Sequence, residues 1–184
     1  MNKRIIKIIA LASVLSFAGA GLYYIVPRTQ VKECIQPFKL ERDKQEILEI
    51  FKKDKYWLVA SEDYSPEFMM ENRAPSKNEP RYYGKLDIKV LYNDQNQFVG
   101  FVAYYMKNFF VGQILFLDVK EEFRGKGYAQ QLMNYAIKEL KSQGATLIIL
   151  VTRTTNESAQ KLYKRLGFTV SHEDNGYVYF ELKS

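Results

Sequence analysis

The sequence predicts a single α/β domain with a mixed, mostly antiparallel sheet flanked by helices, preceded by an apolar N-terminal segment. Three observations lead to this prediction. Residues 85–119 alternate in hydropathy and are interrupted by short polar turns, which is typical of consecutive antiparallel strands. The apolar period changes to that of a helix over residues 129–140, and a nearly all-apolar run follows at 146–151. The length of 184 residues fits one domain of ordinary size.

Composition excludes several classes of protein. One Cys and one His rule out a disulfide framework, a Cys/His zinc site and a two-His metal site within one chain, so we expect no metal. Residues 1–27 hold three of the 27 basic residues and no acidic residue. The rest of the chain, residues 28–184, therefore holds 24 basic and 21 acidic residues. Such a balance does not favour nucleic acid as a partner.

The N-terminal segment has the pattern of a membrane anchor. Residues 8–26 carry no charge, and as a helix they would be about 28 Å long, close to the hydrocarbon thickness of a bilayer. Basic residues precede the run and aromatic residues lie at its far end, as at a membrane interface. The predicted division is therefore an anchor at 1–27, a linker at 28–34 and a domain at 35–184.

Two alternatives remain open for this segment. The first is a cleaved signal peptide with Ala18-Gly19-Ala20 as its cleavage site, which would make the protein secreted or periplasmic. The second is a buried helix of the fold. Basic residues are more numerous after Val26 than before Ile8, which by the positive-inside rule retains the domain in the cytoplasm. We therefore expect a single-pass membrane protein that contacts the membrane through residues 8–26.

The elements of the domain are predicted from local patterns. The first half contains an edge strand at 35–40, a helix at 41–54 and a run at 56–60 that fits either a strand or a helix extension. A helix start at 65–67, with Ser65 as its cap, and a long loop at 71–82 follow. The second half begins with three strands at 85–92, 98–106 and 109–119. A helix at 129–140, a strand at 146–151 and a helix at 154–166 follow, and a hairpin of strands 168–171 and 177–182 closes the chain. The apolar run at 146–151 predicts a strand buried on both faces. Thr154 and Glu157 predict a capping box that opens the short helix at 154–166.

The most informative stretch for function is residues 117–129, where a strand leads into a glycine-rich turn and then into the long amphipathic helix. The N–H groups of the first turn of such a helix have no acceptor inside the helix, and the helix dipole favours negative charge there. Gly125 and Gly127 allow a phosphate to approach the backbone, and Arg124 and Lys126 add positive charge. The stretch therefore predicts an anion site, against the alternative of a plain turn with two solvated basic residues.

With these residues the chain resembles the GCN5-related N-acetyltransferases, from residue 35 to the C-terminus. Residues 124–129, Arg-Gly-Lys-Gly-Tyr-Ala, match that family's R/Q-x-x-G-x-G/A loop. Residues 156–168 match its N-x-x-A-x-x-L-Y-x-x-x-G-F motif, and the distance between the two motifs fits one helix and one strand. The resemblance implies the GNAT acyl-CoA N-acyltransferase fold, with a cofactor cleft where the fourth and fifth strands splay apart. It also implies transfer of an acetyl group from acetyl-CoA to a small-molecule or peptide amine by direct attack.

The resemblance implies roles for individual residues. The loop would hold the pyrophosphate of acetyl-CoA, and the backbone at the end of the fourth strand would pair with the pantetheine arm. Tyr163 would be the catalytic acid that protonates the leaving thiolate, with a core aromatic as the alternative. Asn156 is either a cofactor contact or a helix cap. The predicted cofactor-binding residues are Leu117, Val119, Arg124, Gly125, Lys126, Gly127, Tyr128, Ala129 and Asn156.

One departure from the family concerns the base. Gln113 stands where the histone-acetyltransferase branch carries a Glu, and an amide does not accept the proton. A base would have to come from elsewhere: Asp118, Glu62, Asp63, Glu67 or an ordered water. The missing Glu leaves open a non-catalytic acyl-CoA sensor or scaffold tethered to the membrane. A secreted binding module without a cofactor is a weaker alternative, and His172 and Cys34 receive no role.

Overall fold

The computed structural model describes residues 34–60, 64–71 and 86–183. The strands are β1 (Cys34–Pro37), β2 (Asp87–Tyr92), β3 (Phe98–Met106), β4 (Val111–Val119), β5 (Leu147–Arg153), β6 (Thr169–Asp174) and β7 (Tyr177–Lys183). The α-helices are α1 (Leu40–Leu58), α2 (Pro66–Met70), α3 (Tyr128–Ser142) and α4 (Glu157–Arg165), and a short 3₁₀ helix spans Glu121–Phe123.

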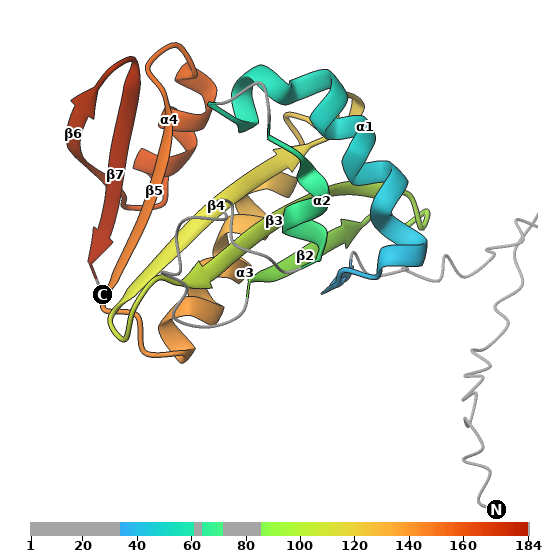
Figure 1. Cartoon of the computed structure of the whole chain (residues 1–184), viewed down its shortest axis with the longest axis horizontal. Helices are drawn as coiled ribbons and strands as arrows, with labels where there is room; N and C mark the ends of the chain where they lie inside the picture. The colour runs from blue at the N-terminus through green and yellow to red at the C-terminus, as the bar shows by residue number, and fades with distance from the viewer. Residues whose placement is uncertain (1–33, 61–63, 72–85, 184) are drawn as a thin grey trace, which may run out of the picture.

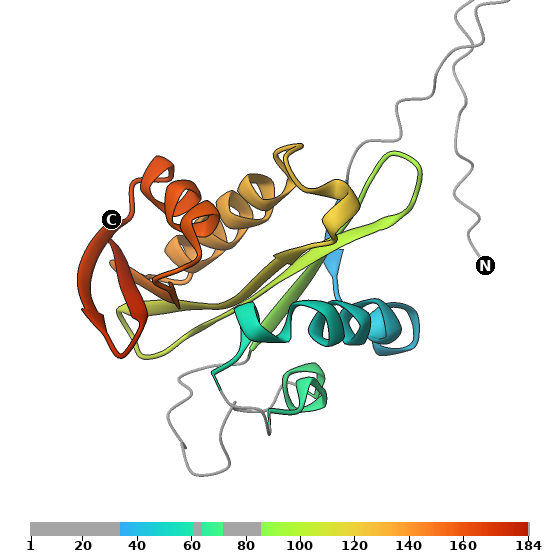
Figure 2. The same cartoon turned by 90° about the horizontal axis from the view of Figure 1, so that it is seen from above.

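The seven strands form one sheet in the order β1-β2-β3-β4-β5-β7-β6 (Figure 1). Neighbouring strands are antiparallel, except that β4 and β5 are parallel. Helices α1 and α2 lie on one face of the sheet and α3 and α4 on the other, as Figure 2 shows. The predicted mixed, mostly antiparallel sheet flanked by helices is thereby confirmed.

Two hydrophobic clusters hold these layers together. One lies under α3 and α4 and includes Leu132, Leu140, Ile148 and Phe180, all at most 1% exposed. The other lies under α1 and α2 and includes Phe51, whose ring is 5.3 Å from that of Phe116 on β4. The apolar stripe predicted for α3 is therefore the face that packs on the sheet.

Several predicted boundaries differ from the structure. Helix α1 continues through a kink at Asp54 (φ −109°, ψ 18°) to Leu58, so the run at 56–60 is mostly a helix extension. Strand β4 begins only at Val111, because the side-chain oxygen of Asn108 accepts hydrogen bonds from the N–H groups of Phe110 and Val111 and closes a turn.

The predicted capping box of α4 is wrong. The N-cap is Asn156, whose Oδ1 accepts a hydrogen bond of 3.2 Å from the N–H of Ala159. Thr154 instead donates its N–H and its hydroxyl to the carbonyl oxygen of Gly176, at 2.9 and 3.2 Å. A tertiary contact with the β6–β7 turn therefore takes the side chain that local sequence assigns to the cap.

Strand β5 is also not buried on both faces. Ile148 and Leu150 are buried toward α3, whereas Val151, on the other face, is 42% exposed. Helix α1 contacts β3 and β4, and Figure 1 shows α1 and α2 over this part of the sheet. On this face the end of α1 reaches Arg153, whose Nε donates to the carbonyl oxygen of Tyr56 at 2.6 Å, and Val151 stays partly exposed.

The predicted anchor at 1–27 and the linker up to residue 33 lie outside the described residues, as does nearly all of the predicted loop at 71–82. Within the described ranges, no helix combines the length and the apolar character needed to cross a bilayer. This finding contradicts the localisation predicted from the sequence, that of a single-pass membrane protein.

Candidate active site

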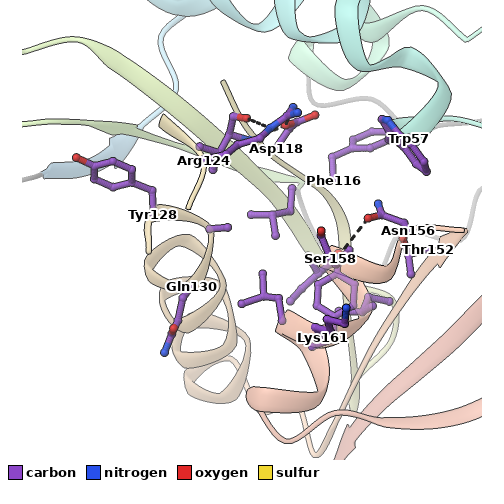
Figure 3. Close-up of a pocket in the computed structure, with 18 of the residues that line it drawn as sticks. Trp57, Phe116, Asp118, Arg124, Tyr128, Gln130, Thr152, Asn156, Ser158 and Lys161 are labelled. Atoms are coloured by element: carbon purple, nitrogen blue, oxygen red, sulfur yellow. Dashed lines mark hydrogen bonds and ion pairs between the residues drawn. The ribbon is translucent and has the colours of Figure 1, made fainter. Parts of the chain in front are cut away.

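A cleft opens where β4 and β5 separate. The two strands pair over three residues only, from Val111 with Leu147 to Gln113 with Ile149. Beyond that point a cavity of about 810 Å³ lies between them (Figure 3). Its volume is in the range of sites that hold cofactors and other small molecules. Its walls come from the end of α1, the second halves of β4 and β5, the glycine loop, the start of α3 and one face of α4.

The glycine loop forms an open cradle at one end of the cavity. Gly125 (φ +77°) and Gly127 (φ +87°) adopt left-handed backbone conformations, and no atom lies within 4 Å of where their Cβ atoms would be. Helix α3 has no side-chain cap, and Gln131 donates to the carbonyl oxygen of Gly127. The side chains of Tyr128 and Gln130 point away from the centre of the cavity in Figure 3, so the helix presents its backbone there. A phosphate fits these residues.

Arg124 lies at the rim of this cradle and is bound by its own protein. Its Nε donates to the carbonyl oxygen of Val119 at 2.8 Å. Its Nη2 donates to Asp54 Oδ2 at 2.7 Å and to Asp118 Oδ1 at 3.1 Å, the latter drawn in Figure 3. The guanidinium therefore joins α1, β4 and the loop, and an arriving phosphate would meet an arginine already paired with two carboxylates.

Lys126 is placed differently from its neighbours. It does not line the cavity, although the other residues from Arg124 to Ala129 do. Its ammonium donates to the carbonyl oxygen of Glu122 at 3.1 Å and lies over the ring of Phe123. Lys126 thus packs against the 3₁₀ turn. Asn156 does line the cavity, while its side-chain oxygen caps α4.

The open edge of β4 supplies backbone groups to the cleft. The N–H of Lys120 donates to Val99 on β3, and neighbouring residues of a strand direct their backbone groups to opposite sides. Leu117 and Val119 therefore direct theirs toward the side where β5 no longer pairs. The N–H of Val119 donates to Asp118 Oδ1, and its carbonyl oxygen accepts from Arg124 Nε. Leu117 is therefore the edge residue whose backbone groups face the cleft.

Tyr163 lies on α4 and lines the same cavity as the glycine loop. It is 8% exposed, and its ring packs 6.1 Å from that of Phe168 and 5.6 Å from that of Phe180. Burial raises the pKa of its phenol above the usual value of 10, and the charge of Asp118 adds to the increase. The hydroxyl therefore stays protonated at neutral pH and can donate a hydrogen bond.

The candidate bases separate clearly. Asp118 lines the cavity, and burial, followed by repulsion from Asp54, raises its pKa to about 6. Glu67 does not line the cavity and accepts a 2.6 Å hydrogen bond from Ser65. The Oε1 atom of Gln113 accepts a 2.9 Å hydrogen bond from Tyr105. The remaining two candidates, at positions 62 and 63, lie outside the described residues.

Sequence reasoning missed part of the cavity wall. Trp57, at the end of α1, faces the cleft, as Figure 3 shows. Helix α4 contributes Ser158, Lys161 and Arg165. The i, i+3, i+7 spacing of these three polar side chains is a signal that could have identified this face. No sequence signal pairs Asp54 with Arg124, because the two are 70 positions apart. In the part of the chain that the structure describes, no three metal-ligating side chains come together.

Comparison with known proteins identifies the class. The model of the acetyltransferase (GNAT) family matches residues 44–168. N-alpha-acetyltransferase 30 of Schizosaccharomyces pombe is 40% identical over 57 residues, which are 31% of this chain and 38% of that protein. Mycothiol acetyltransferase of Corynebacterium efficiens is 28% identical over 100 residues, 54% of this chain and 33% of that protein. The matches thus cover little more than a third of these curated relatives.

A solved structure supports the fold. The PaiA N-acetyltransferase from Thermoplasma acidophilum, in complex with coenzyme A, superimposes with a TM-score of 0.63 at 20% identity, covering 83% of this chain and 99% of that one. Because the family model matches more than half of the chain, the chain belongs to the acetyltransferase (GNAT) family. Its class is that of the N-acetyltransferases, and acetyl-CoA is the acyl donor of this family.

Proposed function

We propose that this protein transfers an acetyl group from acetyl-CoA to a primary amine by direct attack. The observation that carries the proposal is one cavity that is lined both by an anion cradle and by a buried phenol, that of Tyr163. The names of the relatives, N-alpha-acetyltransferase and mycothiol acetyltransferase, support an amine on a peptide or a small molecule as the acceptor.

The cradle and the strand edge divide the binding of the cofactor between them. The backbone N–H groups at the start of α3, with Arg124, hold the pyrophosphate. The backbone of Leu117 pairs with the pantetheine arm along the open edge of β4. From Val119 back to Ile114 this edge is about 17 Å long at the rise of an antiparallel strand, which leads from the cradle toward the point where β4 and β5 meet. Asn156 closes the opposite wall.

Two residues that line the cavity, Tyr163 and Asp118, carry the chemistry. Bound acetyl-CoA supplies a thioester whose carbonyl carbon is the electrophile. As the lone pair of the amine forms the new C–N bond, the C–S bond breaks and Tyr163 Oη donates its hydrogen to the departing sulfur. The proton that the amine loses passes to water, and Asp118 is the carboxylate lining the cavity that accepts it from there.

The non-catalytic alternative, an acyl-CoA sensor or scaffold, requires the cradle but not the acid. A buried, protonated phenol that lines the same cavity as the cradle argues against it, because a binding module has no need of a donor at the sulfur.

The test is Gly127→Glu, with Gly176→Glu as the matched control. Both glycines have a left-handed φ, +87° and +82°, and neither has an atom within 4 Å of the position that a Cβ would take, so both substitutions cause similar backbone strain. Only Gly127 lines the cavity, where Glu would place a carboxylate in the phosphate cradle. Calorimetry should show acetyl-CoA binding lost in the first variant and retained in the second. Equal affinity in both would refute the site.

A further inference from the structure

A second, smaller cavity of about 190 Å³ lies behind the point where β4 and β5 meet. Gln113 pairs with Ile149, and Ile149 pairs with Glu181 on β7, so these three side chains form a row on one face of the sheet. The alternate residues of β5 are buried toward α3. The cavity therefore opens on the face opposite α3, the same face on which Val151 is exposed.

The two cavities adjoin. Leu150 and Val151 line both of them. Gln113 and Ile149, which line the smaller one, are the last pair of residues before the strands separate into the cleft. A group seated in the smaller cavity is thus beside the end of the cleft to which the edge of β4 leads.

From this we propose that the smaller cavity binds the apolar substituent next to the acceptor amine. The inference rests on the proposed function and deepens it. The cradle and α4 occupy the α3 side of the cleft, so the acceptor has to approach from the opposite face. The acceptor is then a primary amine that carries an aliphatic or aromatic group of about one amino-acid side chain.

The walls fit such a group. The rings of His172 and Tyr179 are stacked in parallel, 4.2 Å apart at an interplanar angle of 9°, and form a flat wall. Ile149 and Val151 supply aliphatic surface. At about 190 Å³ the cavity is below the 300–1,000 Å³ typical of whole-ligand sites, so it holds one group of an acceptor.

Charged groups of both signs lie at the rim. Lys107 and Glu181 line the cavity, and the carboxylate of Glu181, whose side chain is 26% exposed, lies 3.3 Å from the ammonium of Lys183. The rim therefore carries no excess of negative charge, and the apolar walls are the part of the cavity that fits the substituent of the acceptor. The same row places Glu181 two strands from Gln113.

The experiment uses the full chain with glycinamide and leucinamide as probe amines. Ser171→Phe fills the cavity from the exposed edge strand β6, and Val170→Phe is the matched control on the same strand, because Val170 does not line the cavity. In the wild type, kcat/KM for leucinamide should exceed that for glycinamide about tenfold or more. Ser171→Phe should bring this ratio close to one, and Val170→Phe should preserve it. Calorimetry with coenzyme A present should show weaker leucinamide binding in Ser171→Phe alone.

Acetyl-CoA affinity, measured in all three proteins, separates this inference from the proposed function. If the wild type does not bind acetyl-CoA, the proposed function itself is refuted. If acetyl-CoA binds, the cavity is refuted by any of three results: no acetylation of either amide, no preference for leucinamide, or a preference that Ser171→Phe leaves intact.

Discussion

The pairing of Arg124 with two carboxylates leads to a prediction in which two substitutions break the same ion pair with opposite effects. If Arg124 binds the pyrophosphate, it must leave Asp54, which holds its Nη2 at 2.7 Å. Asp54→Asn removes this competitor and one negative charge near the cradle, so acetyl-CoA should bind more tightly. Arg124→Gln removes the ligand itself, so acetyl-CoA should bind more weakly.

The size of each effect follows from exposure. The side chain of Arg124 is 44% exposed, so solvent screens its pairing with Asp54, and such pairs contribute about 0.2–1 kcal/mol. Release of the pair should therefore tighten acetyl-CoA binding by up to about fivefold. Loss of a charged hydrogen-bond donor costs about 1.5–3 kcal/mol, so Arg124→Gln should weaken binding by about tenfold or more.

The assay is equilibrium titration with acetyl-CoA, followed by the fluorescence of Trp57. This is the single tryptophan of the chain and it lines the cavity. Glu46→Gln is the matched control, since Glu46 lies on the same helix and pairs with Lys120 just after β4, but neither residue lines the cavity. Weaker binding in Asp54→Asn would show that the ion pair supports the loop and does not compete with the phosphate, which contradicts this prediction.

Two further predictions concern Tyr163 and Asp118. Tyr163→Phe should lower kcat by about 10²–10⁴ with little change in acetyl-CoA affinity or stability, because Phe keeps the packing against Phe168 and Phe180 and loses only the donor; equal rates in steady-state kinetics would make Tyr163 a packing residue. Burial raises the pKa of Asp118 to about 6, so between pH 4 and 6 the native carboxyl binds a proton that the unfolded chain lacks, and the wild type loses stability as the pH rises through this range. The Asn side chain of Asp118→Asn does not titrate. The free energy of unfolding of this variant minus that of the wild type, measured by urea unfolding, should therefore rise by up to about 3 kcal/mol from pH 4 to pH 7. A difference that does not change with pH would contradict the burial of the charge.

Local rules explain why part of the site could be predicted. The glycines at 125 and 127 are required by left-handed backbone angles, and the helix after them by an apolar stripe with the period of a helix. Both are encoded within a few neighbouring residues. The position of Tyr163, seven residues after Asn156 on one short helix, follows from the same kind of local spacing.

Local rules also fail at identifiable places. Lys126 sits inside the loop motif, yet it turns back to the carbonyl oxygen of Glu122. Thr154 has the sequence of a cap, yet it bonds to Gly176. The expectation of membrane localisation came from a run at 8–26 that lies outside the described residues, and the described part of the chain holds no helix able to span a bilayer.

By itself, the sequence determined the order of the elements, the glycine cradle at the start of α3 and the family whose motifs these residues match. The tertiary structure sets where the cleft opens, because β4 separates from β5 after Gln113 and this depends on the pairing of residues 36 positions apart, Gln113 and Ile149. It also decided that Arg124 is held by Asp54, and that His172 and Glu181 stand beside the end of the cleft. Contacts between distant residues depend on packing and register, which no local pattern of side chains encodes.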